Sequence, residues 1–210
     1  MDEGKKLVQC ISAISAYGRE IDSLCETLND QITQRFSRDD LPCKPVGKMV
    51  SDLRRDETEW VCTDVAWSLP LAGKKARIGR PEMYLGYQIS LAGDGMAFVG
   101  NEEPLLHLCL WESDIDFNEV YMGYPLDEDP AITIKDNRLI VWEGPGTTWK
   151  KDCWTFSIRL LTLDSSNALL ERVINPAIAL LNETPVTSSL PDDLLGLVLY
   201  SDINFLRYHT

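Results

Sequence analysis

Apolar residues recur at helical spacing through the first 36 positions of the chain. Alternating steps of four and three residues separate Leu7, Ile11, Ile14, Gly18, Ile21, Cys25, Leu28 and Ile32. This period of about 3.5 predicts one long helix. Its length of roughly 45 Å exceeds the diameter of a small domain. The helix either lies along a sheet or projects and pairs with another chain as a homodimer. Because Gly18 and Cys25 are weak seam residues, packing on a sheet is favoured.

After this helix the pattern changes to short strands. Pro42, Pro45 and Gly47 mark residues 37–50 as a linker. Strands are then predicted at residues 59–69, 83–91, 96–99, 105–111, 131–134, 138–142 and 154–163. Pro70 is expected to end the first strand, and Gly93-Asp94-Gly95 predicts a hairpin between the second and third. Alternation of apolar and polar residues from Trp154 onward predicts one buried face for the last strand.

A second helix is predicted near the C-terminus. Asp164, Ser165 and Ser166 offer N-caps for a helix over residues 167–181, which Pro176 should kink. Residues 184–191 are a predicted loop, and residues 194–200 form a last strand or a helical turn.

The order of elements predicts an α+β fold. In it, a long N-terminal helix and a C-terminal helix pack on an antiparallel β-meander of about six to seven strands. We expect a single domain over residues 1–210. Its parts are the N-terminal helix (1–36), the linker (37–50), the antiparallel sheet (51–163) and the C-terminal helix with its tail (164–210).

Charge is distributed very unevenly along the chain. The net charge is −13, and residues 81–134 contain 11 acidic residues without a single Lys or Arg. Such a field repels nucleic-acid phosphates and anionic membranes and attracts basic partners. We therefore expect a basic protein partner, and binding to neither nucleic acid nor membrane. A solvated surface without a specific partner is the alternative.

The cysteines and the N-terminus indicate where the chain resides. Its six cysteines form no C-x-x-C motif, which favours reduced, buried thiols that act as small hydrophobic residues. No apolar stretch approaches the length of a membrane span, and the first residues lack the apolar core of a signal peptide. These features predict a cytoplasmic protein.

Signatures of catalysis are scarce, which favours a non-catalytic protein without a cofactor. The nucleophile elbow, the phosphate-binding loop and the dinucleotide fingerprint do not occur. His107 and Cys109 share one face of a predicted strand, where a thiolate–imidazole pair can be imagined. Two residues apart on one strand is poor geometry for that hydrogen bond, and the flanking leucines favour a buried structural histidine.

One carboxylate cluster stands out, at residues 112–119. If the strand ending at Trp111 continues, Glu112, Asp114 and Asp116 share one face and are able to hold Mg²⁺ or Ca²⁺. The alternative is a solvated strand face. An EF-hand is not indicated, because Glu119 stands at the position of the turn glycine and Pro125 at that of the bidentate glutamate.

These patterns favour a non-catalytic, acidic protein-binding module of the inhibitor, immunity, antitoxin or adaptor type. Its candidate contact residues are Glu112, Asp114, Asp116, Glu119, Asp127, Glu128, Asp129 and Trp149. Trp149 is included because we expect it to be exposed in a glycine-rich loop, where it would serve as an aromatic anchor. Two alternatives stay open. The first is a metal-dependent hydrolase that uses the carboxylates of 112–119. The second is a small-ligand pocket between the sheet and the C-terminal helix, lined by Trp154, Phe156 and Ile178.

Overall fold

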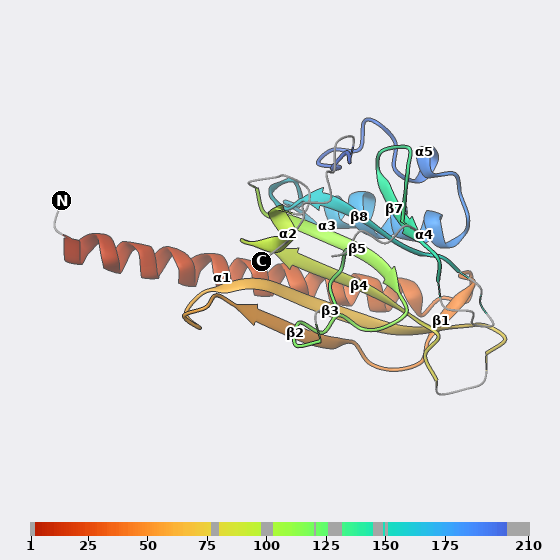
Figure 1. Ribbon diagram of the computed structural model, residues 1–210, viewed down its shortest axis with the longest axis horizontal. Helices are drawn as coiled ribbons and strands as arrows, with labels where there is room; N and C mark the ends of the chain where they lie inside the picture. The colour runs from red at the N-terminus through yellow and green to blue at the C-terminus, as the bar shows by residue number, and fades with distance from the viewer. Residues whose placement is uncertain are drawn as a thin grey trace.

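An antiparallel sheet with the long N-terminal helix and the C-terminal helices on one face forms the centre of the structure (Figure 1). The computed structural model describes residues 3–76, 80–97, 103–119, 121–125, 132–144, 149 and 151–200. A long helix, α1 (Glu3–Phe36), precedes the sheet, one short helix lies between two of its strands, and further short helices follow it. This arrangement confirms the predicted α+β fold.

Eight strands pair in the sheet within the described residues, every pair antiparallel. They are β1 (Cys43–Pro45), β2 (Val50–Arg55), β3 (Cys62–Gly73), β4 (Met83–Ser90), β5 (Leu105–Trp111), β6 (Thr133–Lys135), β7 (Leu139–Trp142) and β8 (Cys153–Arg159). The spatial order is β1-β3-β4-β5-β8-β7-β6, with β2 also paired to β3. The sheet is therefore no simple meander, because β8 inserts between β5 and the β6–β7 hairpin.

Two strand predictions at the start of the sheet were wrong. The expected linker 37–50 contains β1 and the first residue of β2. Pro70 does not end its strand, since β3 continues to Gly73. Pro70 lies in the gap between the two strands that share one edge of β3, because β1 pairs with residues 71–73 and β2 with residues 62–68. Its missing N–H therefore interrupts no ladder.

The segment 93–97 was also predicted wrongly. Gly93-Asp94-Gly95 does not form a hairpin, because residues Asp94–Ala97 form a single helical turn, α2. Gly95 packs so closely on β4 that a Cβ atom would lie 1.8 Å from the hydroxyl oxygen of Ser90. Only glycine fits there. Residues 98 and 99 of the expected strand lie outside the described residues.

The second half of α1 packs on the sheet. Its buried residues are Cys25, Leu28, Ile32 and Phe36, which join the main hydrophobic core with residues of β3, β4, β5 and β8. The hydroxyl of Tyr87 on β4 donates to the side-chain oxygen of Asn29, 2.9 Å away. The predicted packing of the N-terminal helix on the sheet is thus confirmed for this half.

The C-terminal helix covers the same face of the sheet. It runs through α3 (Ser166–Leu169), a π-helical segment η2 (Leu170–Ile174) and α4 (Asn175–Leu181). Ser165 is the N-cap, because its hydroxyl oxygen accepts from the backbone N–H of Ala168. The π segment ends at Ile174, two residues before Pro176, where the missing N–H and the proline ring disturb regular α-helical bonding. A short helix, α5 (Val186–Ser189), occupies the predicted loop.

Both faces of β8 are buried, so the prediction of a single buried face was wrong. The polar side chains of Thr155 and Ser157 face away from the helices and are covered by residues from outside the sheet. Thr155 donates to the backbone oxygen of Gly123, and the Ser157 hydroxyl lies 2.8 Å from that of Tyr200. Alternation alone could not reveal this second layer, because polar residues normally mark a solvated face.

Truncation of the two halves of α1 should have very different effects on stability. Ile32→Ala removes a side chain that is 1% exposed, whereas Ile11→Ala truncates one that is 53% exposed. We expect the first to lower the free energy of unfolding by about 2–5 kcal/mol and the second by less than about 0.5 kcal/mol. Urea denaturation in dilute solution measures both values. Equal losses would contradict the placement of α1.

Candidate functional site

The first half of α1 projects beyond the sheet and exposes large apolar side chains (Figure 1). Leu7 and Val8 are each 63% exposed, Ile11 53%, Ile14 50% and Tyr17 67%. We call these five residues the open stripe. Leu7, Ile11 and Ile14 lie on the side of the helix that continues into the buried residues Cys25, Leu28 and Ile32, and Val8 and Tyr17 flank them on either side. One apolar seam is therefore covered by the sheet along its second half and uncovered along its first.

Local sequence explains why α1 runs past the sheet. Its apolar period continues without a proline from Leu7 to Phe36, so nothing ends the helix where the sheet does. Gly18 lies at this transition, and no atom outside the helix lies within 4 Å of the place of its missing Cβ. Ile21 and Leu24 are the first residues that pack against the core. The sequence favoured packing of the helix on the sheet and did not indicate that its first half projects beyond it.

An exposed tryptophan lies at the same end of the sheet as the projecting helix. Trp60 is 83% exposed in the turn between β2 and β3, and this turn and the projecting half of α1 extend in the same direction in Figure 1. Asp56 shapes the turn, because its carboxylate accepts from the backbone N–H groups of Trp60 and Val61. The sequence placed Trp60 inside a strand. The signal against this was the polar run from Asp56 to Glu59, typical of a turn.

The acidic segment 112–119 does not continue β5. The strand ends at Trp111, and the carboxylate of Asp116 accepts from the backbone N–H groups of Asn118 and Glu119 in a tight turn. The backbone N–H of Phe117 donates to Asp52 on β2. The expected row of carboxylates on one strand face is therefore absent, because turn formation uses one of them.

The charged residues of this segment are exposed or half-buried. Glu112 and Glu119 are exposed, Asp114 and Asp116 are half-buried, and the ion pairs found in the described ranges involve none of the four. Glu103 precedes β5 at the far end of that strand, where it pairs with Arg159 at 3.4 Å. Among the residues that the structure describes, no three His, Cys, Asp or Glu side chains gather as metal ligands.

The remaining predicted contact residues have different outcomes. Asp127, Glu128 and Asp129 lie outside the described residues. Trp149 was expected to be exposed, but it is half-buried and packs against the main core. A Cβ on Gly73 would lie 3.3 Å from the Cβ of Trp149. The tryptophan thus fills space beside β3, which the glycine-rich loop composition did not indicate.

Comparison with known proteins gives no relative. No family model, curated protein or solved structure matches the chain. Within the described ranges, no helix has both the length and the apolar composition to cross a membrane. The properties of the surface and of the buried groups therefore carry the functional conclusions.

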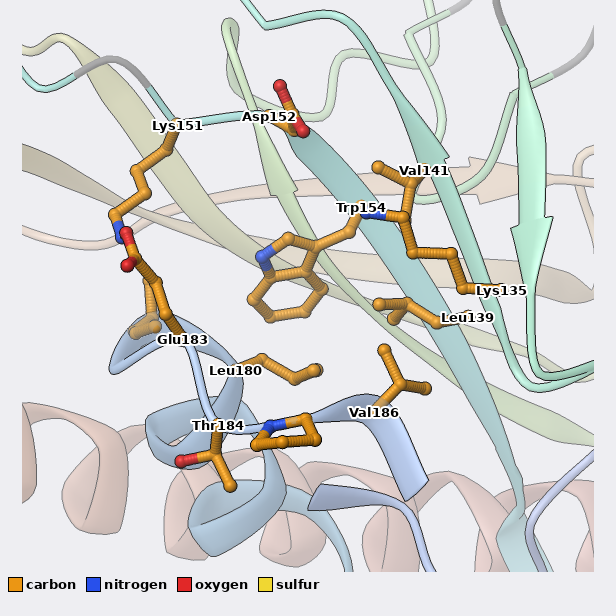
Figure 2. Close-up of a pocket in the computed structure, with 12 residues that line it drawn as sticks. Lys135, Leu139, Val141, Lys151, Asp152, Trp154, Leu180, Glu183, Thr184 and Val186 are labelled. Carbon is orange, nitrogen blue, oxygen red and sulfur yellow. The ribbon is translucent and has the colours of Figure 1, made fainter. Parts of the chain in front are cut away.

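A groove of about 350 Å³ lies between the β7–β8 edge and the C-terminal helices (Figure 2). Trp154 lies at the centre of its lining and faces Leu180, while Lys151 and Glu183 form an ion pair beside it. This is the expected place of the small-ligand pocket. Phe156 and Ile178, however, do not line it, and Trp154 is only 6% exposed. The lining of the groove contains both basic and acidic side chains, so its charge favours neither anionic nor cationic ligands.

The face of the sheet away from the helices buries a row of polar side chains. Gln88, His107 and Ser157 lie in register on β4, β5 and β8. The Nδ1 atom of His107 is 2.6 Å from the hydroxyl oxygen of Ser157, and the backbone N–H of Gly123 donates to the side-chain oxygen of Gln88. The amide of Gln88 in turn donates to Asp64. The row ties four strands to the segment that covers them.

Burial decides the protonation of these groups. It lowers the pKa of His107 to about 3 and raises the pKa of Cys109 to about 12. Burial also raises the pKa of Asp64, although hydrogen bonds from Ser90 and Gln88 oppose the shift. At neutral pH the imidazole is therefore neutral and the thiol protonated. His107 bonds to Ser157, and the thiol of Cys109 lies against the backbone oxygen of Gly86.

The low pKa of His107 predicts a pH-dependent stability. The folded protein keeps the imidazole neutral, whereas the unfolded chain binds a proton below the ordinary pKa of 6.5. This contribution to stability is therefore complete above pH 6.5 and is lost as the pH falls toward 3, by up to about 1.4 kcal/mol per pH unit. In His107→Gln this dependence should disappear. Denaturant unfolding of both proteins from pH 7 to 4 measures the difference, and parallel pH profiles would contradict it.

Proposed function

We propose that this protein is a non-catalytic protein-binding module whose main contact element is the open stripe of α1. The observation that carries the proposal is the exposure of five large apolar side chains on a helix that projects from the sheet. Contiguous exposed apolar surface on a soluble protein is typical of interaction sites.

Helix energetics support the same conclusion. The projecting half contains Gly18 and the β-branched residues Val8, Ile11 and Ile14, which are weaker helix formers than alanine or leucine. Most of the stability of a helix in a protein comes from packing of its apolar face. A partner that covers the open stripe supplies this packing, with anchors spaced as in helix-in-groove recognition.

The buried groups support a non-catalytic role. The described His107, Cys109 and Asp64 are buried and engaged in contacts within the fold. A catalytic acid, base or nucleophile has to reach a substrate, commonly in a cleft. Burial beneath the covering segments accounts for the shifted pKa values of these residues, so a catalytic role is not needed to explain them.

A second contact surface is favoured by the carboxylates of exposed Glu112 and Glu119 and half-buried Asp114, which form no ion pair within the part of the chain that the structure describes. Exposed acidic groups without ion pairs attract a basic protein and speed its association, with modest effects on final affinity. We therefore retain a basic partner for this segment. Trp60 is a further exposed aromatic residue, at the end of the sheet beside the open stripe.

The contact element is tested by a pair of substitutions on α1. Ile11→Glu places a charge in the open stripe, whereas Gln9→Glu adds the same charge to a neighbouring exposed position outside the stripe. We expect Ile11→Glu to abolish capture of binding proteins, the intact protein itself included, because a buried unpaired charge is costly. Affinity capture with tagged protein, followed by mass spectrometry, compares the variants. Equal capture by both would refute the proposed element.

The basic partner is tested separately by charge reversal. Glu112→Lys, Asp114→Lys and Glu119→Lys, combined in one protein, should remove those captured proteins whose binding weakens with added salt. Asp116 is left unchanged because its carboxylate supports the turn. The matched control reverses the exposed residues Glu143, Glu171 and Asp193. Loss of the same proteins in both variants would show that only net charge matters.

A further inference from the structure

We propose that the partner of the open stripe is a second copy of this chain, bound antiparallel, so that the protein is a two-fold symmetric dimer. This inference deepens the proposed function and rests on it. In this dimer the two projecting halves of α1 lie side by side, and the two-fold axis passes midway between Ile11 and Ile14.

Continuity of the apolar seam supports a helical partner. The sheet covers the seam from Cys25 to Phe36, and α1 first contacts the core at Ile21. Residues 3–20 extend for about 27 Å, and the seam on them follows the period of 3.5 that suits a paired helix. In an antiparallel pair of this length, the N-terminus of the partner helix reaches the point where the sheet begins. The partner thus continues the cover that the sheet provides.

Side-chain sizes along the seam support the antiparallel register. With the axis between Ile11 and Ile14, each Ile11 lies opposite Ile14 of the partner subunit. Each Leu7 then lies opposite Gly18 of the partner subunit. Nothing in the described structure fills the space at the missing Cβ of Gly18, so a leucine fits there. In a parallel pair Gly18 would face a second glycine and leave a gap in the seam.

Charges on the two ends of the projecting half favour the same orientation. Lys5 and Lys6 lie near the N-terminus, whereas Glu20 and Asp22 lie near the sheet, and all four are exposed. In the antiparallel pair Lys5 and Lys6 lie at about the same level along the axis as Glu20 and Asp22 of the partner subunit. Arg19 opposes this attraction in part. A parallel pair would place like charges level with one another at both ends, so orientation is set by charge as well as by shape.

Self-association is tested with the intact protein by sedimentation equilibrium over a range of concentrations. We expect a dimer for the wild type and for Gln9→Glu. For Ile11→Glu the dissociation constant should rise by on the order of 100-fold, as for a central interface anchor. Circular dichroism and thermal unfolding verify that Ile11→Glu retains the folded sheet, which the 53% exposure of Ile11 leads us to expect. A wild type that stays monomeric at every concentration would overturn the inference.

Orientation is tested with Cys10, which is free and exposed on α1. In the antiparallel pair Cys10 lies about 3 Å along the axis from residue 17 of the partner subunit, on the same flank. Oxidation of the Tyr17→Cys variant should therefore link Cys10 of one subunit to the introduced thiol of the other, as peptide mapping will show. Seven residues on one helix separate these positions by about 10 Å, too far for a disulfide within one chain. A dimeric Tyr17→Cys variant that forms no such link on oxidation would overturn the proposed register.

The outcomes separate this inference from the function on which it rests. If the wild type is monomeric but Ile11→Glu loses captured proteins of other sequence, the open stripe binds a different chain and only the second-copy inference fails. If the wild type is monomeric and capture is unchanged, both fail. Dimerisation lost in Ile11→Glu, together with the link between Cys10 and the thiol introduced at position 17, supports both.

Discussion

Contact between the second half of α1 and the sheet is the constraint on which the other features of the molecule depend. Leu28 and Ile32 are almost completely buried there, and Tyr87 fixes the helix through its hydrogen bond to Asn29. Because the helix is continuous, anchoring this half also sets the direction of the other half. The same contact that completes the core therefore presents the open stripe to solvent.

The sheet is covered on its other face in a different way. Loop residues and the extended segment before Tyr200 lie over a row of polar side chains that bond to one another. A buried polar row fixes register more strictly than an apolar one, because each unpaired donor or acceptor would be costly. It also explains why His107, the residue with the most obvious chemical potential in the sequence, belongs to the architecture. Its neighbours on both adjacent strands are polar, and one of them holds its Nδ1 atom.

Much of the fold was predictable from local pattern, and the failures have identifiable physical causes. The prediction of β5 at residues 105–111 and of Ser165 among the helix caps agrees with the structure, because alternation and capping are local effects. The end of β3 was predicted wrongly at Pro70, because a strand tolerates a proline only where no neighbouring strand needs its N–H. That position depends on where β1 and β2 end beside β3. The strand after Gly95 was wrong because Gly95 is required for close approach to Ser90, which involves a tertiary contact. For the candidate site, the heptad spacing of α1 was visible, but the point at which the sheet stops covering it depends on the three-dimensional extent of the strands.

The continuous helix also couples rotation to sequence length. Each residue turns an α-helix by about 100°, so the angular relation between the open stripe and the buried half of α1 is fixed by the number of residues between Gly18 and Cys25. One residue added there would swing the stripe toward a different side of the molecule, while the sheet and its core kept their places. Seven added residues would restore its direction and move it outward by about 10 Å. The number of residues between Gly18 and Cys25 thus sets the angle around the helix axis between the open stripe and the buried face of α1.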